Sequence, residues 1–160
     1  MMARTRRLVM FTAAAGAILP GYAMSKGPNM NEAQSNKAVV ARFIEVVWRE
    51  GQLDQLPSFW TVDCVNHADP SRDKNGLAAL RRYHESFGKS FADFEGLQIN
   101  LDQQVAERDR VVTQMTTRAH HKPTGRQVSL ATIRIDRLEG AKIAEHWSLA
   151  DMAGLAQQLA

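Results

Sequence analysis

Residues 139–160 read EGAKIAEHWSLADMAGLAQQLA, and this closing segment carries the clearest pattern of secondary structure and polar residues in the chain. Glu139 and Gly140 are typical of a turn, and the residues that follow, 142–149, have the composition of a short strand. Asp151 then precedes a small apolar helix. A glutamate, a histidine, a tryptophan and an aspartate therefore lie close together in an otherwise apolar strand–helix unit, which makes them candidates for chemistry.

The chain before this segment is expected to hold amphipathic helices first and long strands afterwards. Helical spacing of apolar residues covers 31–50 and 75–88, a short strand covers 62–67, and extended segments cover 94–106, 110–121 and 126–138. This order indicates an α+β fold. We expect a cone-shaped, curved antiparallel sheet with the N-terminal helices packed on its concave face, and a mouth that admits a small hydrophobic molecule.

Residues 1–30 have the features of a leader and linker, which leaves residues 31–160 as one domain. Arg4, Arg6 and Arg7 precede an apolar run that ends near Pro20, as in an export signal. We therefore expect an exported, periplasmic protein with no membrane segment beyond the signal. A true start at Met24 or Met30 would instead give a cytoplasmic product.

The charge distribution argues against a nucleic-acid partner. Four of the 20 Lys and Arg residues, and none of the 17 Asp and Glu residues, lie in residues 1–30, so the remainder has a formal charge of −1. The basic character belongs to the leader, and nucleic-acid binding loses its main support. Cys64 is the only cysteine, so no internal disulfide can form. It lies in a strand-like run with Val62, Asp63 and Val65 and has no His, Arg or Lys neighbour to lower its pKa, which indicates a buried thiol that packs as a small apolar group.

Several motifs along the chain resemble one family. They are VWREGQLD (47–54), VNH (65–67), GL (76–77), DRV (109–111), PTGR (123–126), KIAEHW (142–147), Asp151, GL (154–155) and QQL (157–159). From about residue 36 to residue 159 the chain resembles the SnoaL-like polyketide cyclase and ester cyclase proteins of the nuclear transport factor 2-like superfamily, whose fold is an α+β cone.

The resemblance implies a cofactor-free, small-molecule enzyme of cyclase or isomerase type that acts on a hydrophobic carbonyl compound. It implies an aspartate near the C-terminus as general acid/base, which Asp151 matches best. A helper histidine has no clear counterpart, and Arg134 or Arg137 is the nearest position. The resemblance also implies a homodimer formed through the open sheet face. Because members of this superfamily differ in function, a non-catalytic ligand-binding or dimerisation domain is the alternative.

Strand alternation selects the catalytic candidates. It predicts that Glu145 and Trp147 share an apolar, pocket-facing side, that Asp151 follows on that side, and that His146 points outward. A carboxylate in an apolar pocket has a raised pKa and can act as a base. Glu145 and Asp151 are therefore the predicted catalytic residues. The alternatives are helix capping by Asp151 and an ion pair between Glu145 and an inward Arg134.

The remaining candidates are side chains that could contact a substrate. They are Trp147, Arg134, Trp48, His67, Tyr83 and His84. The chain contains no glycine-rich nucleotide motif, phosphate loop or nucleophile elbow. Its His, Asp, Glu and Cys residues have no metal-site spacing, and the adjacent His120 and His121 face opposite ways on a strand. We therefore expect neither a cofactor nor a metal.

Overall fold

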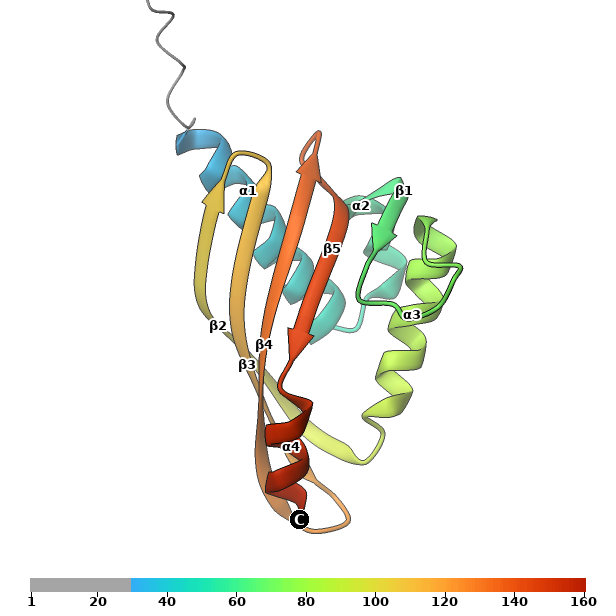
Figure 1. Ribbon diagram of the computed structural model, residues 1–160, viewed down its shortest axis with the longest axis vertical. Coiled ribbons are helices and arrows are strands. Elements are labelled where there is room, and N and C mark those ends of the chain that lie inside the picture. The colour runs from blue at the N-terminus through green and yellow to red at the C-terminus, as the bar shows by residue number, and fades with distance from the viewer. Residues whose placement is uncertain (1–29) are drawn as a thin grey trace, which may run out of the picture.

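The computed structural model describes residues 30–160, in which helices lie against one side of a five-stranded sheet (Figure 1). The elements are α1 (Met30–Phe43), a π-helical turn η1 (Ile44–Arg49), a 3-10 turn η2 (Leu53–Gln55), α2 (Leu56–Phe59), β1 (Trp60–Asn66), α3 (Gly76–Ser90), β2 (Phe94–Glu107), β3 (Arg110–His121), β4 (Arg126–Glu139), β5 (Lys142–Ala150) and α4 (Met152–Leu159). The leader predicted for residues 1–30 lies, up to residue 29, outside the described residues.

The strands follow the order β1-β5-β4-β3-β2. Strands β2 to β5 form the expected antiparallel meander, and β1 adds a parallel edge strand beside β5. The α+β class, with helices on one side of an open sheet, is thus confirmed, and the parallel pair makes the sheet mixed. In Figure 1, α1 crosses behind the strands and α3 stands beside the β1 edge.

The main core lies between α1 and the upper half of the sheet. Phe43 is completely buried, and the rings of Trp60 and Phe59 meet it edge to face at centroid distances of 5.6 and 5.9 Å. On the sheet side, Val111 and Met115 are buried in the same cluster. Burial of each such side chain stabilises the fold by roughly 1.5–3 kcal/mol, which explains why the apolar stripe of α1 is held against the sheet.

The β4–β5 hairpin is closed by a two-residue loop. Gly140 and Ala141 both have positive φ, 55° and 62°, between the paired residues Glu139 and Lys142. Positive φ at both loop positions is the geometry of a type I′ turn, whose twist matches that of the flanking strands. The loop therefore fixes where β5 begins relative to β4.

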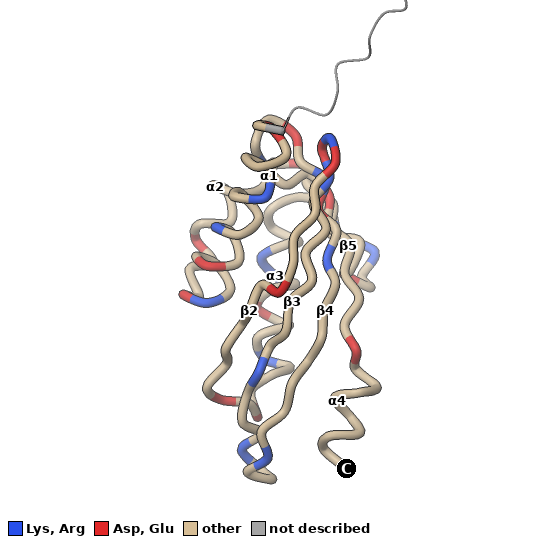
Figure 2. The backbone as a smooth tube through the Cα atoms, turned by 90° about the vertical axis from the view of Figure 1, so that its left-hand side faces the viewer, with Lys and Arg blue, Asp and Glu red and all other residues tan. Residues whose placement is uncertain are grey.

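A second, smaller core lies at the lower end of the sheet. Leu155 of α4 packs there with Ala119, Val128 and Leu130, beside the ring of Phe91. Figure 2 shows that α4 carries no charged residue, whereas Lys and Arg mark the turn that joins β3 and β4. Within residues 30–160, no helix is both long enough and apolar enough to span a membrane.

Candidate functional site

Strand β5 contains a bulge that exchanges its two faces. Arg137 of β4 pairs with Glu145, but the next residue, Leu138, pairs with Ile143, so Ala144 is an extra residue on β5. Beyond such an extra residue, each side chain of the strand points to the opposite face of the sheet from the one that simple alternation predicts. His146 is consequently 4% exposed and faces the helices. The predicted inward position of Glu145 and Trp147, and the predicted outward position of His146, are both wrong for this reason.

On the outer side of the sheet, the carboxylate of Glu145 forms a small polar cluster. Arg137 Nε donates to Glu145 Oε1 at 2.6 Å, and His67 Nε2 lies 2.9 Å from Oε2. The His67 ring stacks on Trp147, with centroids 4.4 Å apart and an interplanar angle of 4°. The hydrogen bonds from His67 and Arg137 lower the pKa of Glu145. The partners of Glu145 are thus His67 and Arg137, and not Arg134 as the sequence suggested.

Asp151 lies at the start of α4 and is exposed. Its Oδ1 accepts a hydrogen bond from the backbone N–H of Gly154 at 2.8 Å, so it caps the helix. The cap is tight, because a Cβ atom at Gly154 would collide with the Asp151 carboxylate. The capping role that the sequence left open is therefore present. A catalytic role for Asp151 or Glu145 stays a prediction.

Strand β4, which pairs with the bulged strand β5, supplies a buried ion pair. Arg134 and Asp136 are both 0% exposed, on the inner face of β4. Arg134 donates from Nε to Asp136 Oδ2 at 2.8 Å and from Nη2 to Oδ1 at 2.7 Å. His146 Nδ1 lies 2.9 Å from the same Oδ1, because Asp136 and His146 are directly opposed across the β4–β5 ladder. We call these three residues the buried triad.

The protonation of the buried triad follows from its charges. Burial works against the charged form of Asp136, but Arg134 and His146 outweigh it and hold the pKa of this carboxyl at about 2. Burial and the charge of Arg134 lower the pKa of His146, so the imidazole is neutral near pH 7. A carboxylate can only accept hydrogen bonds, so Nδ1 carries the proton. The lone pair of His146 Nε2 is then available as a base.

Enclosed side-chain nitrogen atoms without a hydrogen-bond partner among residues 30–160 surround the triad: Trp60 Nε1 and Asn66 Nδ2 lie beside His146, and three more belong to Arg134 and its neighbours. These three are Arg134 Nη1, Trp48 Nε1 and His84 Nε2. The Arg134 guanidinium lies over the Trp48 ring, 5.1 Å from its centroid, and the Trp48 and His84 rings are 6.2 Å apart. Buried polar groups are nearly always satisfied, so neighbouring exceptions mark a place where a ligand or water belongs.

His84 contributes a neutral ring to this place. Burial lowers its pKa to about 3, and the positive charge of Arg134 acts in the same direction. Tyr83, the preceding residue, has a pKa raised by burial and by Asp69, and lowered in part by Arg134. Tyr83 is therefore within electrostatic reach of both the buried triad and the surface loop that carries Asp69.

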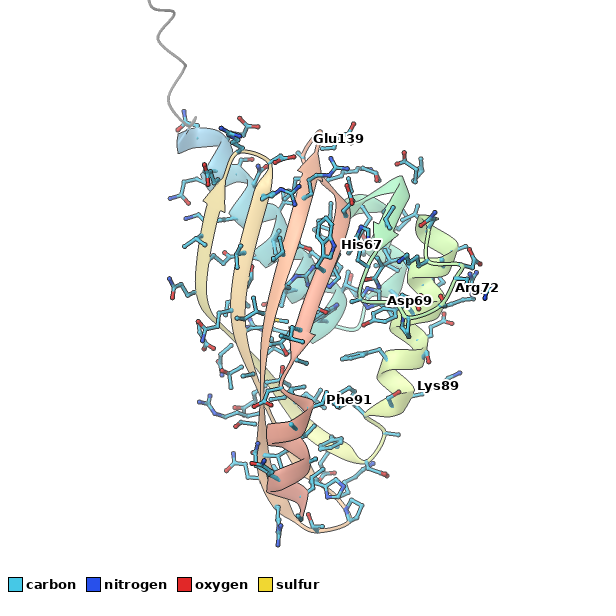
Figure 3. The ribbon with its side chains drawn as sticks, viewed as in Figure 1. His67, Asp69, Arg72, Lys89, Phe91 and Glu139 are labelled. Atoms are coloured by element: carbon cyan, nitrogen blue, oxygen red, sulfur yellow. The ribbon has the colours of Figure 1, made fainter. Side chains whose placement is uncertain are left out.

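That loop and α3 enclose an open cleft of about 450 Å³. Tyr83 and Phe87 of α3 form one wall, and Asp69 and Asp73 of the loop form another; Arg82, Pro70 and three serines, Ser71, Ser86 and Ser90, complete the lining. Figure 3 shows Asp69 on the loop that faces α3, with Phe91 lower down, toward α4. Tyr83 lines the cleft and is within electrostatic reach of Arg134, but no residue of the buried triad lines the cleft itself.

The lower end of the molecule is nearly filled. A gap of about 20 Å³ remains among Phe91, Phe94, Leu97 and Leu155 and their neighbours. Among residues 30–160, no group of three or more His, Cys, Asp or Glu side chains is placed to hold a metal ion.

The structure divides the predicted site residues into three sets. Arg134, Trp48 and His84 come together inside the fold, and Tyr83 lines the cleft next to them. The predicted pair Glu145 and Trp147 joins His67 on the outer face, and Asp151 lies apart at α4. Sequence reasoning missed Asp136 and the inward position of His146. The signal for Asp136 was its position at an even spacing from the apolar residues Val128, Leu130 and Leu138, because residues two apart on a strand share one face.

Comparison with known families gives one match. The family model for SnoaL-like polyketide cyclase matches residues 38–159. No curated protein is significantly similar to the chain.

Several solved structures have the same fold. A candidate polyketide cyclase from Acidithiobacillus ferrooxidans is 22% identical, with a TM-score of 0.67 over 78% of this chain and 94% of that chain. IdmH, a candidate polyketide cyclase from Streptomyces antibioticus, is also 22% identical, with a TM-score of 0.66 over 78% and 97%. AclR, a candidate hydroxylase from Streptomyces galilaeus, is 26% identical, with a TM-score of 0.63 over 79% and 96%.

Proposed function

The chain belongs to the SnoaL-like polyketide cyclase family, and on this premise we propose that it is a small-molecule enzyme of cyclase or isomerase type. In this proposal His146 is the general base, Asp136 holds its ring in one tautomer, and Arg134 stabilises the charge that develops on the substrate. The observation that supports it is the Asp136–His146 hydrogen bond beside a guanidinium with an unpartnered Nη1.

The proposed chemistry starts with proton abstraction next to a carbonyl group. Neutral His146 Nε2 takes the proton, the C–H bond breaks, and its electron pair moves into an enolate. The enolate oxygen accepts hydrogen bonds from Arg134 Nη1 and Trp48 Nε1, which are buried and have no other partner among residues 30–160. Reprotonation at another atom completes an isomerisation. Attack of the enolate carbon on a second carbonyl, followed by return of the proton to the alkoxide, completes a ring closure. Neither route consumes an oxidant or a reductant, which agrees with the cofactor-free expectation.

The carboxylates predicted from the sequence are weaker candidates for this step. Glu145 lies on the outer face, where His67 and Arg137 already contact both of its carboxylate oxygens. Asp151 is exposed, and one of its oxygens holds the N–H of Gly154. These positions favour structural roles for both residues, and the experiment below compares them with His146 directly.

A second candidate function is ligand binding without catalysis. The observation that favours it is the complete burial of Arg134 and Asp136, together with the nearly filled lower end of the fold. A buried ion pair can serve structural specificity alone. Turnover, and not binding, therefore separates the two functions.

We also propose that the chain self-associates through the outer face of the sheet. Val105, Val112, Ile135 and Trp147 form one row across the strands, and Leu149 extends the apolar surface. Val105 is 52% and Leu149 78% exposed. An exposed apolar sheet face of this kind is typical of an interface between protein subunits.

The test of the enzyme proposal measures proton abstraction without knowledge of the natural substrate. The protein is incubated in D₂O with a panel of cyclic aromatic ketones, and exchange of the hydrogens next to the carbonyl is followed by NMR. A general base contributes roughly 10²–10⁴-fold, so His146→Gln is expected to lose at least about 100-fold of the exchange rate. His120→Gln, which changes an exposed histidine of β3, is the matched control.

Glu145→Gln and Asp151→Asn are measured in parallel and are expected to retain exchange. Loss of exchange in either of them, with normal exchange in folded His146→Gln protein, would move the catalytic role back to the carboxylates. Saturable ketone binding without exchange in the wild-type protein would favour the binding function.

A further inference from the structure

The imidazole of His146 has one nitrogen on each side of its strand. Its Nδ1 lies 2.9 Å from Asp136 Oδ1 on β4, and the sheet order β1-β5-β4 places β4 and β1 on opposite sides of β5. The two nitrogens of an imidazole point in nearly opposite directions, so Nε2 is directed away from β4. Strand β1 lies on that side, and it is the strand from which this nitrogen can receive a neighbour.

Asn66, the last residue of β1, lies beside His146. The two residues are partners in the parallel β1–β5 ladder, and the next backbone N–H, that of His67, donates to the carbonyl oxygen of His146 at 2.8 Å. Asn66 is 1% exposed, and its Oδ1 accepts the N–H of Ala68 at 3.1 Å. The amide oxygen is thus occupied, whereas Nδ2 is an enclosed donor without a partner in the described part of the chain.

Trp60, the first residue of β1, brings a second donor to the same histidine. Its ring meets the His146 ring edge to face, with centroids 6.1 Å apart and an interplanar angle of 81°. Trp60 Nε1 is also enclosed and has no partner among residues 30–160. An indole N–H can only donate, and His146 Nε2 can only accept while Nδ1 carries the proton. Two unused donors therefore lie next to one unused acceptor.

One oxygen atom with two lone pairs and a hydrogen satisfies all of these groups. A water molecule accepts from Asn66 Nδ2 and Trp60 Nε1 and donates to His146 Nε2. Three hydrogen bonds are the usual number for a buried water, which belongs where buried polar groups otherwise have no partner. A carbonyl oxygen suits the position less well, because it has no hydrogen to offer to Nε2.

We propose that Asn66 and Trp60 hold a water molecule against His146 Nε2, and that the protein adds this water to carbonyl compounds as a second activity. The inference goes beyond the proposed function, from which it takes His146 as the base and Arg134 as the group that meets the carbonyl oxygen. The substrate class is a ketone, which is hydrated reversibly, or a cyclic ester, which is opened to a hydroxy acid.

The step requires no reactant besides water and the carbonyl compound. His146 Nε2 takes a proton from the water, the electron pair of that O–H bond forms the new C–O bond, and the π electrons move to the carbonyl oxygen. This oxygen accepts hydrogen bonds from Arg134 Nη1 and Trp48 Nε1. In a ketone it then receives the proton from Nε2, which gives a hydrate that can lose either oxygen. In an ester the C–O bond to the leaving alkoxide breaks, and the alkoxide receives the proton.

The test uses 2-tetralone and dihydrocoumarin, in which a ring oxygen replaces the CH₂ group between the carbonyl and the aromatic ring. Uptake of oxygen-18 by 2-tetralone from labelled water is followed by mass spectrometry, its deuterium exchange in D₂O by NMR, and hydrolysis of dihydrocoumarin by absorbance. The wild-type protein is expected to accelerate oxygen-18 uptake and hydrolysis above the protein-free rates. His146→Gln is expected to lose at least about 100-fold of this acceleration, since it lacks the base.

Two variants connect the water reactions to β1. Asn66→Leu removes the Nδ2 donor at similar side-chain size, and Trp60→Phe removes the Nε1 donor but keeps an aromatic ring. Each is expected to lower oxygen-18 uptake and hydrolysis about tenfold, the worth of one hydrogen bond, and to leave deuterium exchange nearly unchanged. Asn36→Leu is the control, because it makes the same change at a buried asparagine of α1, whose Nδ2 donates to Arg108 O.

The ratio of the two exchange rates decides the outcome. Equal loss of oxygen-18 and deuterium exchange in both variants would mean that they only displace His146, and would overturn the inference. Wild-type protein that exchanges deuterium without oxygen-18 uptake or hydrolysis would also overturn it, and so would full water reactions in folded Asn66→Leu and Trp60→Phe protein. Water reactions that depend on Asn66 and Trp60, in a protein without deuterium exchange, would instead remove the proposed proton abstraction from carbon alone.

Discussion

His84 should make the protein sensitive to mild acid. In the folded protein burial lowers its pKa to about 3, whereas an unfolded chain has the ordinary value near 6.5. The unfolded state therefore binds more protons than the folded state between these two values, so stability falls as the pH falls through this window. Between pH 7 and pH 5 the free energy of unfolding is expected to decrease by about 2 kcal/mol from this group. Replacement of His84 by Phe, which cannot bind a proton, should remove that share of the decrease.

The assay is urea unfolding of wild-type and His84→Phe protein at several pH values from 7 to 5. The difference in stability between the two proteins should change by about 2 kcal/mol across this range, whatever its value at pH 7. His146, whose pKa is also lowered, adds a decrease common to both proteins. His120→Phe, at an exposed position of β3, is the control and should follow the wild type. Parallel pH profiles for wild-type and His84→Phe protein would refute the reasoning.

Three further predictions concern single contacts. Asp151→Ala should lower the free energy of unfolding by about 1 kcal/mol through loss of the α4 cap, and Asp151→Ser should retain most of it; equal urea midpoints for the two variants would contradict this. Arg134→Met should destabilise by about 3–5 kcal/mol, because Asp136 is left as an unpaired buried charge, and Arg134→Met/Asp136→Leu should recover part of the loss in the same assay. Leu149→Glu on the outer face should shift a self-associated protein toward monomer in light scattering, with Lys89→Glu on α3, away from that face, as the exposed control. A monomeric wild-type protein at micromolar concentration would contradict the proposed interface.

The fold class was predictable because it depends on local patterns. The helical spacing of Val40, Phe43 and Val47 and the strand pattern after residue 94 each specify an element, and their order specifies α+β packing. The resemblance to the SnoaL-like family is likewise confirmed by the family match.

Among the strands of the sheet, the site was predictable only on β4, where alternation is regular. Arg134 and Asp136 share their side with Leu130 and Leu138, so both could be placed on the inner face from the sequence. The faces of β5 depend on its pairing with β4, and the bulge that sets them has no marker in the residues 142–149. The inward position of His146 is therefore a property of the sheet as a whole.

The bulge at Ala144 also has a consequence for how this protein could change. Deleting Ala144 would leave Glu145 opposite Arg137 and His146 opposite Asp136, so both would keep their present faces. A one-residue slip that pairs Ala144 with Arg137 would instead turn Glu145 and Trp147 toward the interior and His146 toward solvent, where an imidazole-modifying reagent would detect it. This exchange requires no substitution, because Glu145, Trp147 and His146 are all already present on β5. A one-residue change of register in β5 would thus replace an imidazole with a carboxylate inside the fold, so the register of this strand, and not only its residues, determines which chemistry the interior can carry.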